Sequence, residues 1–323
     1  SQLMMILALL PLVFIEVLEV NWVMISLLTL HNTFVAISDI AIDALAADSL
    51  KEDQLAKANG FMWGSKTLGR GLGMALATSV FYAYGVNEGF AILICTMSLI
   101  LLLPILSKEL NYKAGHEAQL YKNRLTFNEL VLGIRQSMFN PSAFAAIIFM
   151  LFANIGYGIF DVIYNEFYIK ELGWNGEEIG HMRPYGMWLG GLIGLSAGLM
   201  TLYFRKRSLL LFFVIGQAVV FLTASTLSYE TSILLTSAVL VGVDAVDAGW
   251  SVLIFSILMA LCTTQTSATN FGIFMGFGNI SMLIGNNIAP AILGSGDFTF
   301  AFTFAALTLI PCLISGYYLT KET

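Results

Sequence analysis

Charged residues are scarce in this sequence, and their scarcity excludes most classes of soluble protein. They make up 11% of the 323 residues, whereas 58% are hydrophobic and the mean hydropathy is +0.81. An ordinary soluble domain carries about 25% charged residues. Because a water-exposed surface cannot be built from so few charges, most of the surface must face lipid. The net charge is −6, and the lysines and arginines do not cluster into a basic patch, which argues against nucleic-acid binding.

The motifs of soluble enzymes and metalloproteins are missing as well. The sequence contains no Gly-x-x-x-x-Gly-Lys-Ser/Thr loop, which an ATP-driven pump would need, and no His-Glu-x-x-His motif. Its histidines are isolated, and its cysteines lie in apolar stretches without paired spacing. We therefore predict no enzymatic activity, no cofactor and no metal. We expect small buried thiols at Cys95, Cys262 and Cys312.

Long apolar stretches make up most of the sequence, and they predict ten membrane-spanning helices. A helix of about 20 apolar residues crosses a hydrocarbon core of roughly 30 Å. The stretches are too long for strands and lack the alternation of a strand. The predicted spans are residues 2–18, 22–46, 57–84, 88–107, 141–166, 184–204, 208–227, 232–262, 269–293 and 298–319.

The longest polar segment separates the first four spans from the last six. The predicted domains are therefore an incomplete helical bundle over residues 1–107, a linker over 108–140 and a six-helix bundle over 141–323. Within the linker, Thr126 followed by Glu129 predicts a capping box that opens an amphipathic helix. Its apolar face is expected to hold Phe127, Leu130 and Ile134.

The distribution of lysine and arginine predicts the orientation in the membrane. If the linker is cytoplasmic, eleven of these residues lie on the cytoplasmic side, and only Lys170 and Arg183 lie on the other. Such an excess is typical of cytoplasmic loops, so both chain ends are predicted to be cytoplasmic. The eleven are Lys51, Lys57, Lys108, Lys113, Lys122, Arg124, Arg135, Arg205, Lys206, Arg207 and Lys321.

A weak internal repeat of small residues connects the third and ninth spans. Small residues at such spacing allow close helix packing in lipid, and related halves are common in secondary transporters. The alternative is that the alignment of these small residues arises by chance in a glycine-rich chain. The aligned residues are Gly60, Gly64, Gly73 and Ala77 with Gly272, Gly276, Gly285 and Ala289.

Four charged residues within the second and third spans form a first candidate site. Asp39 and Asp43 lie one helical turn apart, as do Lys66 and Arg70. At 1.5 Å per residue, Asp39 and Lys66 lie about 12 and 13 Å from the cytoplasmic ends of their spans, so they can pair. Charges in membranes are usually functional or paired. Two interpretations remain open: a proton-responsive or gating cluster, and a permanent structural bridge.

A second candidate set lies in the last six spans. Tyr157 and Asp161 are one turn apart on the fifth span, and Asp244 and Asp247 on the eighth. We expect them to line a substrate cavity, with an outer-interface anchor as the alternative for Asp161. The ninth span carries the side-chain amides of Asn279 and Asn286. These amides could form hydrogen bonds to a sugar or peptide substrate, or they could hold neighbouring helices together.

Three stretches of the chain resemble the AmpG-type muropeptide permeases, a group of the major facilitator superfamily akin to acetyl-CoA transporters. The first is Asp39-Ile40-Ala41-Ile42-Asp43-Ala44, preceded by Ile37-Ser38 where the family pattern has Thr-Gln. The second runs from Asp161 through residues 167–173 and 178–180. The third comprises residues 258–262 and 268–270. Together the resemblance extends over nearly the whole chain.

The resemblance implies a twelve-helix fold of two bundles, of which this chain holds helices 3–12, the first two being absent. It implies proton-coupled import of muropeptides across a bacterial inner membrane for peptidoglycan recycling. We further expect a monomer surrounded by membrane lipids. Asp39 and Asp43 become the leading functional residues. Two alternatives remain: transport of another anionic solute, such as a CoA ester or nucleotide bound by Lys66 and Arg70, and a non-transporting sensor or assembly factor.

Overall fold

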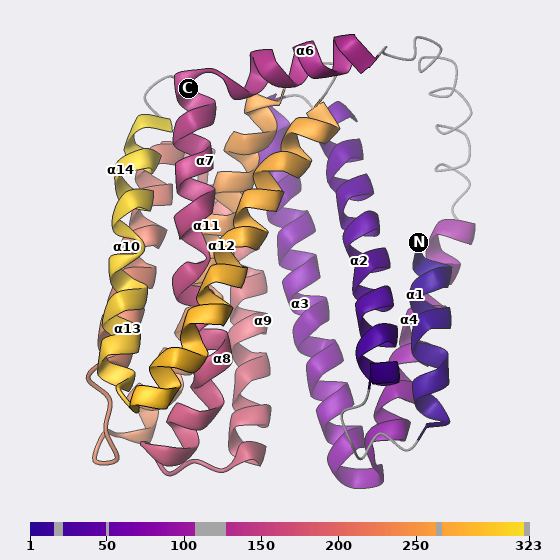
Figure 1. The fold of residues 1–323 in the computed structure, drawn as a ribbon, viewed down its shortest axis with the longest axis vertical. Coiled ribbons are helices and arrows are strands. Elements are labelled where there is room, and N and C mark those ends of the chain that lie inside the picture. The colour runs from indigo at the N-terminus through magenta and orange to yellow at the C-terminus, as the bar shows by residue number, and fades with distance from the viewer. Residues whose placement is uncertain (16–21, 50–51, 107–126, 263–266, 320–323) are drawn as a thin grey trace. The chain divides into compact units, whose positions relative to one another are not determined.

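The computed structural model describes residues 1–15, 22–49, 52–106, 127–262 and 267–319, and every regular element in these ranges is helical (Figure 1). The first part comprises α1 (Gln2–Leu9), η1 (Leu10–Val13), α2 (Trp22–Ser49), α3 (Glu52–Tyr84), α4 (Val86–Leu106) and α6 (Phe127–Met138). The remainder comprises α7 (Pro141–Ala153), α8 (Ile155–Lys170), α9 (Gly176–Met200), α10 (Lys206–Ala224), α11 (Ile233–Leu261), α12 (Ser267–Ser295), α13 (Phe298–Leu307) and α14 (Ile310–Leu319).

Length and apolar composition confirm the all-helical membrane class. Within the described ranges, six helical segments are long and apolar enough to cross a bilayer. They are Trp22–Asp43, Val86–Leu103, Pro141–Lys170, Lys206–Ala224, Ile233–Leu261 and Phe298–Leu319. Three further helices, α3, α9 and α12, are 33, 25 and 29 residues long. Glycine and polar residues lower the hydropathy of these three, so the six spans do not include them.

The chain divides into two compact units. The first comprises Ser1–Leu45 and Gly73–Gly133, and the second comprises Ala46–Leu72 and Ile134–Thr323. Contacts therefore group the first part of α3 with the six-helix part of the chain. The division of the chain at a linker over 108–140 remains a prediction.

Polar side chains hold the first unit together where its helices meet. The Asn87 amide donates to the carbonyls of Val13 and Ile15, at 3.0 Å each. The His31 ring nitrogen Nδ1 lies 3.1 Å from the carbonyl oxygen of Met5. These contacts connect α4 and α2 to the N-terminal helical segment.

In the second unit, α9 packs along α11 and α8 packs along α12 (Figure 1). The predicted single span 141–166 is two helices, α7 and α8, which meet at Asn154. The Asn154 backbone N–H donates to Ser281 Oγ at 3.0 Å, and its side chain donates to the Gly278 carbonyl at 3.2 Å. Polar groups freed at the break are thus satisfied by α12, as lipid requires. The predicted last span is likewise divided into α13 and α14.

Glycines allow the closest helix contacts in this unit. A Cβ on Gly64 of α3 would lie 2.9 Å from the Gly191 carbonyl oxygen of α9, and a Cβ on Gly60 3.1 Å from Gly198 Cα. A Cβ on Gly285 would lie 2.2 Å from the Ile155 oxygen. The small-residue packing predicted for these three positions is confirmed. At three other glycines of the repeat, no described atom lies within 4 Å of such a Cβ: Gly73, Gly272 and Gly276.

The polar segments agree with the sequence in part. Helix α6 confirms the predicted linker helix, but Thr126 lies outside the described residues, as do the side chains of Phe127, Glu129 and Leu130. Of the residues used for orientation, those outside the described ranges are Lys51, Lys108, Lys113, Lys122, Arg124 and Lys321.

The prediction that all three thiols are buried was partly wrong. Cys262 and Cys312 are buried, but Cys95 is exposed on α4. An exposed thiol inside a spanning helix is compatible with a surface that faces lipid, where an apolar side chain need not be covered by protein.

Candidate functional site

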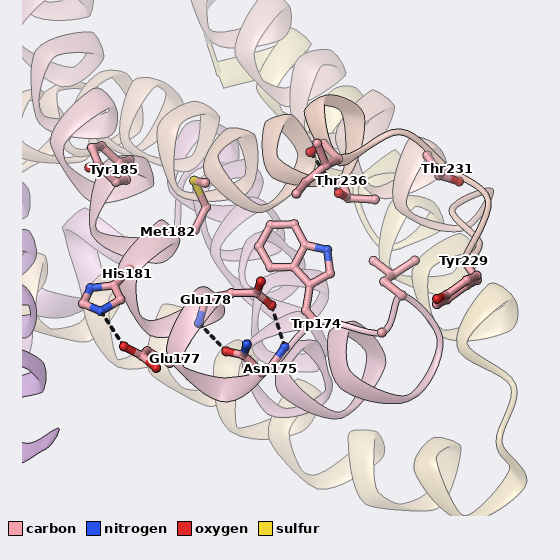
Figure 2. Close-up of a pocket in the computed structure, with 13 residues that line it drawn as sticks. Trp174, Asn175, Glu177, Glu178, His181, Met182, Tyr185, Tyr229, Thr231 and Thr236 are labelled. Atoms are coloured by element: carbon pink, nitrogen blue, oxygen red, sulfur yellow. Dashed lines mark hydrogen bonds and ion pairs between the residues drawn. The ribbon is translucent and has the colours of Figure 1, made fainter.

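A buried arginine, Arg183, organises the polar interior of the second unit. It lies about two turns inside α9, since that helix begins at Gly176, and only 3% of its surface is exposed. The prediction that Arg183 belongs to the outer polar segment was wrong, because the span was started at residue 184. The helix begins directly after Asn175, which forms a capping box with Glu178 through two hydrogen bonds of 2.8 Å (Figure 2).

Two aspartates and a tyrosine from neighbouring helices surround the guanidinium. Arg183 Nη2 lies 2.6 Å from Asp161 Oδ1 of α8, and Arg183 Nε lies 3.4 Å from Asp244 Oδ2 of α11. The Nη2 group also donates to the Tyr157 hydroxyl at 3.3 Å. We call Tyr157, Asp161, Arg183 and Asp244 the Arg183 cluster.

Aromatic rings complete the arginine's surroundings. The guanidinium carbon lies 4.0 Å from the ring centroid of Tyr164 and 5.7 Å from that of Phe160. Cations are attracted to ring faces within about 6 Å. Tyr157, Asp161 and Tyr164 recur at helical spacing, so one face of α8 presents all three to α9. A single helix face therefore supplies both the charge partner and the rings that hold Arg183 in place.

Arg183 is held tightly on the α8 side and more loosely on the α11 side. Asp161 accepts a short hydrogen bond from Arg183, whereas the Asp244 Oδ2 and Arg183 Nε atoms are buried without a hydrogen-bond partner in the described structure. The other oxygen, Asp244 Oδ1, accepts a 2.6 Å hydrogen bond from the Tyr157 hydroxyl. Asp244 is thus attracted to Arg183 by charge without a hydrogen bond, so this contact is weaker than the hydrogen-bonded contact between Arg183 and Asp161.

Two glycines allow α11 to approach Arg183. A Cβ on Gly190 would lie 2.8 Å from the Asp244 backbone oxygen, and one on Gly186 would lie 3.2 Å from Asp244 Oδ2. Both distances are shorter than ordinary carbon–oxygen contacts. Any larger residue at these positions would therefore displace α11 from α9 and separate Asp244 from Arg183.

The cluster contains more negative than positive charge. Arg183 faces two carboxylates, whose side chains are 39% exposed in Asp161 and 5% exposed in Asp244. Asp247, one turn from Asp244 on α11, lies within electrostatic range of Asp244 and of Arg70 on α3. Unpaired charges are expensive inside a membrane. A carboxylate in this arrangement can take up and release a proton, or it can bind a cationic group of a ligand in place of the proton.

Most of the second candidate set therefore gathers in one place. The structure brings Tyr157, Asp161 and Asp244 into contact around Arg183, and the sequence interpretation missed the arginine. Asn279 is exposed on α12. Asn286 lies against α8: with its amide oriented to satisfy both groups, its nitrogen donates to the Gly158 carbonyl at 3.0 Å and the Met282 carbonyl at 3.2 Å. That geometry matches the alternative in which Asn286 holds helices together.

The first candidate set is divided between the two units. Asp39 and Asp43 lie on α2 in the first unit, whereas Lys66 and Arg70 lie on α3 in the second. Their pairing remains a prediction. The Lys66 ammonium lies 5.1 Å from the ring centroid of Trp63, one turn earlier on the same helix. Over the described residues, no group of three or more His, Cys, Asp or Glu side chains is placed to hold a metal ion.

Comparison with known families gives the chain a place among membrane transporters. The family model described as Major Facilitator Superfamily matches residues 1–286, which is most of the chain. No curated protein matches the sequence. The family match agrees with the apolar spanning helices and with a buried ionic cluster in their midst. The chain belongs to the Major Facilitator Superfamily, whose members are multi-pass membrane proteins that move small solutes by secondary transport.

Proposed function

We propose that this transporter imports muropeptide-like sugar–peptides together with protons across a bacterial inner membrane. The observation that supports proton coupling is the Arg183 cluster, where one buried cation faces two carboxylates from different helices. Ionisable residues inside membrane helices commonly form proton relays in transporters.

Asp244 is the proposed proton site. A charge at the centre of a membrane costs about 2.5–3.5 kcal/mol on insertion scales. With Asp161 hydrogen-bonded to Arg183, the nearly buried Asp244 carboxylate is the surplus charge, and a proton removes it. The groups that face Asp244 are Arg183 from α9, Tyr157 from α8 and Asp247 on its own helix.

Protonation at Asp244 would act on the packing of three helices. It removes the attraction between α11 and Arg183, while the tight Asp161 contact keeps α9 on α8. The two arrangements of α11, with and without the attraction to Arg183, then differ in their affinity for the proton. A ligand shifts a conformational equilibrium only by such a difference in affinity between the two states. In transporters of this kind, bundles rock about a site near the membrane midplane. Proton occupancy and solute access are coupled in this way.

Asp39, Asp43, Lys66 and Arg70 are proposed as a second coupling or gating set. The support for the aspartates is the resemblance of residues 39–44 to the permease family. Arg70 is supported by its electrostatic interaction with Asp247, which would join this set to the surroundings of the Arg183 cluster. The same cations are the proposed binding groups if the solute is a CoA ester or nucleotide.

The orientation is proposed from the positive residues. Since Arg183 is buried within α9, Lys170 alone remains of the two basic residues assigned to the outer side. The excess on the linker side therefore increases, and it supports cytoplasmic chain ends. A monomer is the proposed functional state.

Uptake by the reconstituted protein tests this proposal. We expect proteoliposomes to accumulate labelled anhydro-muropeptide when a proton gradient points inward, and to lose that accumulation when a protonophore is added. Protein-free liposomes with the same gradient are the control. Accumulation of a labelled CoA ester or nucleotide in place of the muropeptide would refute the substrate. No accumulation of any of these solutes by correctly inserted protein would favour the sensor alternative.

A further inference from the structure

A groove of about 750 Å³ lies on the surface of the second unit, between the first turns of α7 and the last turns of α14. We call it the α7–α14 groove. Three of its lining residues, Phe144, Ile314 and Tyr318, are 58–63% exposed, and none of the described residues that line it is charged. The Ser315 hydroxyl in its wall already donates to the Pro311 carbonyl at 2.7 Å. Both walls belong to membrane-spanning segments, so the groove faces lipid acyl chains.

The end of α14 is held between α7 and α10. A Cβ on Gly316 would lie 3.4 Å from the Phe149 ring of α7 and 3.5 Å from Leu210 Cδ2 of α10, so this glycine allows α14 to approach both helices. The Cys312 thiol donates to the Phe149 carbonyl at 3.5 Å. The first turns of α10 therefore lie beside the end of α14 that forms the groove.

A cation from the first turn of α10 reaches this end of α14. The Arg207 guanidinium carbon lies 3.5 Å from the ring centroid of Tyr317, and that ring meets the Tyr318 ring edge to face at 5.8 Å. Tyr318 in turn lines the groove. Two ring contacts thus connect the guanidinium with the groove wall. Among the described residues, no carboxylate lies within ion-pair distance of Arg207.

The contact with Tyr317 holds the arginine in place without neutralising it. A ring face attracts a cation through its quadrupole and carries no net charge. The N–H donors of a guanidinium lie in its plane, and they match the oxygens of a phosphate in pairs. The positive charge beside the groove is increased by the two preceding residues, Arg205 and Lys206. Clusters of basic residues next to spanning helices attract anionic lipid headgroups.

An apolar groove that ends beside such a cation fits a ligand with an acyl chain and a negative headgroup. We propose that the α7–α14 groove binds one acyl chain of an anionic phospholipid, whose phosphate is bound by Arg207. The groove supplies the apolar surface for the chain, and the guanidinium supplies the charge for the headgroup. This lipid site is separate from the Arg183 cluster and does not depend on which solute is transported.

Native mass spectrometry of the purified whole protein tests the assignment, with dioleoylphosphatidylglycerol and dioleoylphosphatidylcholine titrated in separate experiments. The two lipids have the same acyl chains and differ in net charge. We expect the first phosphatidylglycerol to bind about fivefold more tightly, because one arginine near the membrane surface contributes about 1 kcal/mol. Arg207→Gln should abolish this preference. Ile314→Trp, at an exposed position of the lining, should fill the groove and weaken the binding of both lipids severalfold.

The matched control is Arg205→Gln, which removes an exposed arginine two residues before Arg207. It should keep the preference for phosphatidylglycerol, and an equal loss in this variant would indicate general attraction and overturn the site. Equal affinity of the wild type for the two lipids would overturn the anionic headgroup. Unchanged binding in Ile314→Trp, or equal competition by glycerophosphoglycerol, which has the headgroup without acyl chains, would overturn the role of the groove.

Discussion

Arg183→Leu is expected to abolish gradient-driven uptake and to lower the stability of the protein by about 3–5 kcal/mol, the usual cost of removing one partner from a buried ion pair. The substitution leaves Asp161 and Asp244 with no arginine between them and removes the cation that Tyr164 and Phe160 enclose. Thermal unfolding in detergent and uptake in proteoliposomes measure the two effects.

Two further variants separate charge from geometry. Arg183→Lys keeps the charge but loses the planar guanidinium that reaches both aspartates. We therefore expect a stability between those of Arg183→Leu and the wild type, and little uptake. Combining Arg183→Leu with Asp244→Asn should recover part of the lost stability, because it removes the carboxylate left unpaired.

The control is Arg135→Leu, which removes an exposed arginine on α6. It should behave like the wild type in unfolding. If Arg183→Leu unfolds at the same temperature as this control, the cluster does not contribute to stability as described.

Gly190→Leu is expected to have the second-largest effect, because it separates the two sides of the cluster without removing a charge. A Cβ at this position already lies 2.8 Å from the Asp244 backbone oxygen, so a leucine must push α11 away from α9. Overpacking a core usually costs about 1–3 kcal/mol. Contact with backbone leaves little room to relax, so we expect the upper end of that range and loss of proton-driven uptake.

Gly272→Leu is the matched control, since no described atom lies within 4 Å of a Cβ at that position of α12. Leucine favours a helix over glycine by up to about 1 kcal/mol, so this variant should be as stable as the wild type or slightly more stable. Equal destabilisation by both substitutions would show that glycine is needed for reasons other than the α9–α11 contact.

Apolar run length was sufficient to predict the helical class and most spans. It failed where a helix is polar or broken. Asn154 interrupts the predicted fifth span because α12 supplies partners for its polar groups, and those partners are more than 120 residues away in sequence. Hydropathy of a local window contains no information about such a partner.

The site was predicted in part for a related reason. Asp161 and Asp244 were identified because acidic residues stand out in apolar spans, and Tyr157 because it lies one turn from Asp161. Arg183 precedes a proline and follows a polar stretch, so hydropathy placed it outside the membrane. Reading the Asn175 capping box as the true helix start would have placed Arg183 inside the helix. That Arg183 faces Asp244 follows only from the packing of α9 on α11.

The central claim is that Asp244 couples a proton to solute movement, and Asp244→Asn tests it most directly. Two assays are run on the same proteoliposomes: accumulation driven by an inward proton gradient, and exchange of labelled for unlabelled solute without any gradient. The account predicts that the variant loses accumulation but retains exchange, since asparagine keeps an acceptor for the Tyr157 hydroxyl and cannot exchange a proton. Gradient-driven accumulation by Asp244→Asn at the wild-type level would contradict it.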